Sequence, residues 1–132
     1  MSVDLCSFTS DRANVASDVV ILHPVTQEPT DIVISVVGSD STRAQECTDR
    51  QQARRIRQMR ASENPTEFDP GEIREDSMEL LVACTTGWKN VVFNGKELEF
   101  SAENVRLVYE RVPAIREQIA KATGSRARFY KP

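Results

Sequence analysis

The chain has 132 residues, of which 39% are hydrophobic and 28% are charged, a composition typical of one soluble globular domain with a modest core. Its 17 basic and 20 acidic side chains leave a net charge of −3, which argues against a general nucleic-acid-binding protein. No run approaches the roughly 18 apolar residues of a membrane span, and the first residues do not resemble a signal peptide, so we expect a cytosolic protein without a membrane partner.

Residues 1 to 17 carry little apolar periodicity, and we expect them to form a flexible arm. Two β-branched runs follow, at 19–22 and 32–37, separated by a segment that contains Pro24 and Pro29. They predict an N-terminal β-hairpin. Because both runs are continuously apolar, we expect a helix or another subunit to cover the strands.

A long basic helix is predicted next. Gly38 ends the second strand, Asp40 and Ser41 provide helix-capping side chains, and the helix runs to about Arg60. Its apolar stripe is thin, and six arginines against Glu46 and Asp49 leave it at +4. We call these arginines the basic block: Arg43, Arg50, Arg54, Arg55, Arg57 and Arg60.

An acidic stretch of opposite charge follows. Seven acidic residues against the single Arg74 leave residues 63 to 79 at −6. We call them the acidic block: Glu63, Glu67, Asp69, Glu72, Glu75, Asp76 and Glu79. A hinge near 61–70, with Pro65 and Pro70, would let the two blocks pair within one molecule or between molecules. Exposed ion pairs contribute only about 0 to 1 kcal/mol each, so these charges would mainly set orientation and partner choice.

An amphipathic helix is expected from Gly71, with an inward face formed by Ile73, Leu80, Leu81 and Cys84. We expect Gly87 to cap this helix and Trp88 to continue its apolar face. Farther on, Asn94 and Gly95 lie between two short apolar runs and predict a second, short hairpin with a tight turn.

A pair of C-terminal helices completes the predicted domain. Ser101 is placed as the N-cap of the first helix, whose inward face is Val105, Val108, Tyr109 and Val112. Pro113 fits the first position of the second helix, which turns Ile115, Ile119 and Ala122 inward and ends at Gly124. The expected core includes Trp88, Phe93, Phe100, Ile115 and Ile119.

These elements predict an α+β fold with one domain over residues 18–124, preceded by the flexible arm 1–17. Residues 125–132 form a basic aromatic tail in which Phe129 and Tyr130 are adjacent. Such a tail either docks a partner or packs back on the domain.

No motif for catalysis or metal binding is present in the sequence. There is one histidine, His23, and the three cysteines, Cys6, Cys47 and Cys84, are odd in number and far apart, which indicates a reducing compartment. We therefore expect no enzyme activity, no catalytic residue, no cofactor and no metal site.

The segment from Leu80 to Ile119 resembles the tail assembly chaperones of long-tailed bacteriophages and prophages. The resemblance is carried by Gly87-Trp88, Phe93-Asn94-Gly95, Leu98, Phe100-Ser101, Glu103-Asn104-Val105, Pro113, Ile115, Gln118 and Ile119. The N-terminal part is similar in plan, with two β-branched strands, a Gly-Ser-Asp-Ser turn and an arginine-rich helix.

The resemblance implies a non-enzymatic factor in the cytoplasm of the bacterial host, absent from the mature virion. It would bind the tape measure protein and keep it soluble while the tail tube protein polymerises around it. We expect self-association as well. The expected interaction residues are Arg50, Arg54, Arg57, Phe129 and Tyr130.

Two other classes remain open. A head–tail or tail-terminator component of the virion would share this size and composition. A small nucleic-acid-binding regulator would use Arg50, Arg54 and Arg57, although the adjacent acidic block would oppose a phosphate backbone, so we do not expect nucleic acid as the partner.

Overall fold

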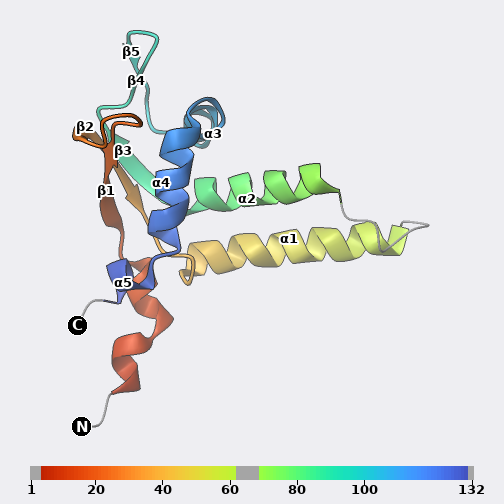
Figure 1. Cartoon of the computed structure of the whole chain (residues 1–132). Coiled ribbons are helices and arrows are strands. Elements are labelled where there is room, and N and C mark those ends of the chain that lie inside the picture. The colour runs from red at the N-terminus through yellow and green to blue at the C-terminus, as the bar shows by residue number, and fades with distance from the viewer. Residues whose placement is uncertain (1–3, 62–68, 131–132) are drawn as a thin grey trace.

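The computed structural model describes residues 4–61 and 69–130. It is an α+β fold in which a small antiparallel sheet is covered on one face by helices, while two long helices extend to one side (Figure 1). The α+β class predicted from the sequence is confirmed, with the N-terminal hairpin, the central helices and the C-terminal helical pair in the expected order.

The sheet has three strands in the order β1-β2-β3: Ser17–Leu22, Pro29–Val36 and Thr85–Lys89. Side chains alternate along β1, so Val19 and Ile21 are buried whereas Val20 is 48% exposed. Val19 lies opposite Ile34, and Ile34 lies opposite Trp88 on the third strand, which places all three on the covered face. The expected covering of the hairpin is therefore provided by helices, on one face only.

The third strand corrects the sequence prediction. The helix that begins at Pro70, α2 (Pro70–Cys84), ends three residues before Gly87, and Gly87 lies within β3 opposite Ser35. Thr85 and Thr86 favour strand, and β2 offers an unpaired edge, so the chain turns into the sheet instead of capping a longer helix. Trp88 is consequently a strand residue, half-buried against the core.

The C-terminal elements follow the prediction closely. The strands β4 (Val92–Phe93) and β5 (Lys96–Glu97) pair across Asn94 and Gly95, which both have positive φ angles of 54° and 77°. Helices α3 (Ala102–Arg111) and α4 (Pro113–Thr123) follow, and the Ser101 hydroxyl accepts the Asn104 N–H at 3.2 Å. Gly124 is the C-cap of α4.

The core lies between the sheet and α2, α3 and α4. Its most deeply buried members come from both halves of the chain, namely Ile34, Val36, Val105, Tyr109 and Ile119. Ile115 is also buried and Phe93 is half-buried, but the prediction was wrong for Phe100, which is 43% exposed. Phe100 instead meets the edge of Trp88, with the ring centroids 5.5 Å apart.

The N-terminal segment is more structured than a featureless arm. Two short 3-10 helices, η1 (Leu5–Phe8) and η2 (Ser10–Asn14), precede β1. Ala13 is 1% exposed, and its carbonyl accepts the Gly38 N–H at 2.9 Å. A side chain at position 38 would crowd Ala13 and Phe129, so glycine permits this close approach of two segments. The end of the predicted arm is thus part of the domain.

Candidate partner-binding surfaces

The first candidate surface is the helical arm, which we define as α1 (Thr42–Ala61) together with α2. The two helices lie side by side and project beyond the sheet (Figure 1). Ser41 caps α1 by accepting the Ala44 N–H at 3.2 Å, and the Asp69 carboxylate caps α2 by accepting the Gly71 N–H at 2.8 Å. The predicted capping role of Ser41 is confirmed.

Between the helices, the basic block meets the acidic block within one molecule. Arg54 Nη2 lies 3.2 Å from Glu79 Oε1 and 3.4 Å from Asp76 Oδ1, and Arg55 Nη2 lies 3.0 Å from Asp76 Oδ2. Of the two arrangements that the charges allow, pairing within the chain is therefore present. Glu63, Glu67 and most of the expected hinge near 61–70 lie outside the described residues.

A buried polar cluster joins the two helices nearer the sheet. Gln51 Nε2 donates to the Asp76 carbonyl at 2.8 Å and to Glu79 Oε1 at 3.2 Å, beside the buried Cys47. Partial burial raises the pKa of Glu79, but hydrogen bonds from Gln51 and Arg54 outweigh it and leave the pKa below its ordinary value. Burial and the neighbouring Glu79 raise the pKa of Cys47, so its thiol stays protonated near neutral pH.

The outer half of the arm exposes apolar side chains. Ile56 is 51% exposed and Met59 48% exposed on α1, while Ile73 is 49% exposed on α2. Arg50 and Arg57 of the predicted interaction set are exposed on α1 as well, whereas Arg54 is engaged by the acidic residues of α2. Three predicted residues therefore share one helix, but they do not have the same environment.

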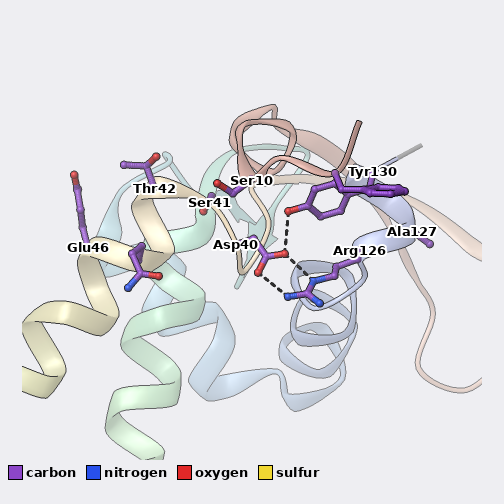
Figure 2. A pocket seen from close by; sticks show the side chains of 10 residues that line it. Ser10, Asp40, Ser41, Thr42, Glu46, Arg126, Ala127 and Tyr130 are labelled. Atoms are coloured by element: carbon purple, nitrogen blue, oxygen red, sulfur yellow. Dashed lines mark hydrogen bonds and ion pairs between the residues drawn. The ribbon is translucent and has the colours of Figure 1, made fainter. Parts of the chain in front are cut away.

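The second candidate surface is a hollow of about 850 Å³ at the start of α1, lined by Phe8, Ser10, Asp40, Ser41, Thr42, Gln45, Glu46, Arg126, Ala127 and Tyr130. At its centre, Asp40 accepts hydrogen bonds from Arg126 Nε at 2.8 Å, from Arg126 Nη2 at 3.1 Å and from the Tyr130 hydroxyl at 3.0 Å (Figure 2). We call these three residues the C-terminal latch.

The C-terminal latch corrects one prediction and decides between the two alternatives left open for the tail. Asp40 does not cap α1, because its carboxylate turns toward the guanidinium group of Arg126, a stronger hydrogen-bond donor than a backbone N–H. The described part of the tail, including α5 (Arg126–Phe129), packs back on the domain. Phe129 lies against the core cluster, and Tyr130 is half-buried.

The electrostatics of the hollow suit structural pairing. The hydrogen bond from Arg126 lowers the pKa of Asp40, so this carboxyl group remains ionised at neutral pH. Desolvation and the hydrogen bond to Asp40 raise the pKa of Tyr130, which keeps its hydroxyl protonated as the donor. The charges of Asp40 and Arg126 within the C-terminal latch therefore satisfy one another.

His23 lies apart from both surfaces, and two of the three cysteines are buried within the helical arm. His23 is exposed in the β1–β2 loop, where its Nδ1 accepts the Val25 N–H at 3.1 Å, while Cys47 and Cys84 are buried at the base of the arm. Over residues 4–61 and 69–130, no group of three or more His, Cys, Asp or Glu side chains has the arrangement of a metal site.

The C-terminal latch was not predicted from the sequence. Asp40 and Arg126 are 86 residues apart, and an aspartate in a Gly-Ser-Asp-Ser turn is first interpreted as a helix cap. The sequence shows that Arg126 precedes the aromatic pair Phe129 and Tyr130, but this pattern does not indicate which residue Arg126 binds.

Within the described part of the chain, no helix is long and apolar enough to cross a membrane. Comparisons with protein-family models, with curated proteins and with solved structures find no match for this chain.

Proposed function

We propose that this protein is a tail assembly chaperone of a long-tailed bacteriophage or prophage. It binds the tape measure protein in the host cytoplasm and keeps it soluble while the tail tube assembles, and it is not retained in the virion. The chemistry is non-covalent binding, so the proposal requires no catalytic group, metal or cofactor.

The observation that carries the proposal is the helical arm. Exposed apolar side chains at Ile56, Met59 and Ile73 lie on helices that are otherwise strongly charged. A chaperone for a long helical chain needs apolar surface to cover its client, together with charges that keep the free chaperone soluble. The arm supplies both.

The residues of the family resemblance support the proposal in a different way. Asn94 and Gly95 form the hairpin turn, Ser101 caps α3, and Pro113 starts α4. These residues build the body from which the arm projects. This division leaves the arm available for binding without disturbing the core.

The proposal is tested by co-expression with the tape measure protein encoded in the same genome, followed by a solubility assay and a pull-down. We expect the tape measure protein to be insoluble alone, and soluble and co-purified when this chain is present. A tape measure protein that stays insoluble beside a folded partner would refute the chaperone role. Detection of this chain in purified virions would instead support a structural component of the tail.

A further inference from the structure

Helix α1 presents a second side that α2 does not cover. The polar contacts with α2 come from one side of the helix, namely Arg43, Cys47, Gln51, Arg54 and Arg55. A different stripe of uncharged residues recurs at spacings of three and four along the same helix, namely Gln45, Thr48, Gln52, Ile56 and Met59. At 100° per residue this stripe lies about a third of a turn from the side that contacts α2. We call it the outer face of α1.

The second half of the outer face, around Ile56 and Met59, is bordered by positive charge, whereas Glu46 and Asp49 accompany its first half. From residue 50 to the end of α1 the helix carries five arginines and no acidic residue. Arg54 and Arg55 are engaged by Asp76 and Glu79 of α2. Among the described residues, Arg57 and Arg60 make no ion pair, so their charges remain available beside Ile56 and Met59.

We infer that the outer face of α1 binds an amphipathic helix whose apolar stripe is flanked by Asp or Glu, so that the two helices of the arm and the bound helix form a three-helix bundle. The apolar stripe would pack on Ile56 and Met59, and the acidic side chains would face Arg57 and Arg60. This inference rests on the proposed function, because it specifies which kind of tape measure segment binds the chaperone.

A second copy of this chain fits the surface less well. Two outer faces packed in parallel would bring the arginines of one copy against those of the other, which is unfavourable. Packed antiparallel over their full length, they would instead place the apolar Ile56 and Met59 of one copy on the polar Gln45 and Thr48 of the other. Of the four acidic residues of α2, Asp76 and Glu79 bind arginines of α1 and Glu75 binds Arg106, which leaves only Glu72 among them without an ion pair to a described residue. The charges left over on the arm therefore favour an acidic helix from another protein.

The two parts of the surface have different effects on binding. Burying the apolar side chains would supply most of the affinity, because charges at the rim of an interface contribute little once screened by salt. The arginines would select the sign of the partner and accelerate association. Binding should therefore weaken with added salt without being abolished.

The probe is a labelled synthetic helix as long as α1, with leucines at spacings of three and four and glutamates on both flanks. Its matched twin carries lysines in place of the glutamates. Fluorescence anisotropy with the full-length protein should show tighter binding of the acidic peptide than of the basic twin.

Two double variants test the two parts of the surface. Ile56→Asp together with Met59→Asp should weaken binding of the acidic peptide by about tenfold or more. Arg57→Glu together with Arg60→Glu should reduce the preference for the acidic peptide over its basic twin.

Val25→Asp is the control, because Val25 is an exposed apolar residue in the β1–β2 loop, outside the helical arm. This variant should bind the acidic peptide as the unmodified protein does. Circular dichroism of each variant checks that the arm is intact, which is expected since every substituted side chain is exposed.

Equal binding of the two peptides, or unchanged binding by the Ile56→Asp and Met59→Asp variant, would overturn the inference. Self-association in sedimentation velocity that this variant abolishes would also overturn it, since the occupant would then be a second copy. Failure with the peptides but success in the tape measure pull-down would refute this surface and leave the chaperone proposal standing. The reverse result would assign the surface and refute the chaperone.

Discussion

At the scale of single residues, a buried hydrogen bond in the core joins Tyr109 to Thr85. Tyr109 is fully buried, and its hydroxyl lies 2.6 Å from Thr85 Oγ1. The Thr85 hydroxyl donates its single hydrogen to the Leu81 carbonyl at 2.8 Å. The Tyr109 hydroxyl is therefore the donor in the hydrogen bond between Tyr109 and Thr85. The tyrosine thus ties α3 to the junction of α2 and β3, and its proton is needed there.

Alkaline pH should therefore weaken the fold. Burial raises the pKa of Tyr109 from 10.0 to about 12, and burial raises the pKa of Cys84 from 9.0 to about 11. Between these values the native state keeps protons that the unfolded chain loses. The stabilising contribution of these two groups is therefore complete below about pH 9, and the free energy of unfolding falls as the pH rises from about 9 to 12. Urea unfolding at a series of pH values measures this decrease.

Two variants assign the effect to its residues. With Cys84→Ala, the free energy of unfolding should fall less steeply at the lower end of this pH range. With Tyr109→Phe, it should fall less steeply at the upper end. Tyr109→Phe should also cost about 1 to 3 kcal/mol at neutral pH, because it removes a buried hydrogen bond. A pH dependence that neither variant alters would contradict this assignment.

At the scale of elements, the Gln118 side chain adds hydrogen bonds to the packing of α4 on the sheet. The Gln118 amide accepts the Leu22 N–H at 2.8 Å and donates to the Leu22 carbonyl at 3.0 Å. It thus satisfies both backbone groups at the end of β1, in the way that a neighbouring strand would. Arg128 similarly donates to the Asp18 carbonyl at 3.2 Å, so the outer edge of β1 is partly covered by the C-terminal elements.

Gln118→Leu should destabilise the protein by about 1 to 3 kcal/mol, because the Leu22 N–H and carbonyl lose their partners where water has limited access. Chemical denaturation followed by far-UV circular dichroism measures the loss. The matched control is Gln58→Leu at an exposed position of α1, which should change stability by less than about 0.5 kcal/mol. Equal effects of the two substitutions would show that the Gln118 bridge does not stabilise the fold.

At the scale of the whole molecule, the C-terminal latch brings the end of the described chain to the start of α1. Asp40, Arg126 and Tyr130 close this contact, and Phe129 fills the space beside Gly38. Since the predicted aromatic docking pair is held against the domain, the arm presents more accessible apolar surface for a partner than the tail does.

Asp40→Asn should loosen the C-terminal segment and leave the rest of the fold intact. Exposed ion pairs contribute about 0 to 1 kcal/mol, so the melting temperature should change little while backbone amides of residues 125–130 exchange faster with deuterium. Hydrogen exchange with mass spectrometry measures this. Asp31→Asn, at an exposed position of β2, is the control and should leave exchange of that segment unchanged.

The C-terminal latch should also respond to acid. Because the pKa of Asp40 is lowered in the folded state, its stabilising contribution is complete above the ordinary value of 3.8 and is lost as the pH falls through the lower folded pKa. The backbone amides of residues 125–130 should therefore stay protected from exchange at pH 5 and lose this protection only in stronger acid.

The sequence by itself determined the elements whose signals are local. Asn94-Gly95, Ser101 and Pro113 mark a turn, a cap and a helix start through the backbone geometry that each residue favours, and all three predictions are confirmed. The two opposed charge blocks were equally visible, because charge is read directly from composition.

Only the tertiary structure decided what depends on distant partners. Thr85–Lys89 became a strand because β2 offered it an edge, and Asp40 left its expected capping role because Arg126 offered a stronger bond. It also determined that Arg54 pairs within the chain, whereas the side of α1 that carries Ile56 and Met59 stays exposed. Local sequence sets the conformations open to each segment, but contacts between remote segments select among them, because burial and ionic hydrogen bonds outweigh the small differences in local preference.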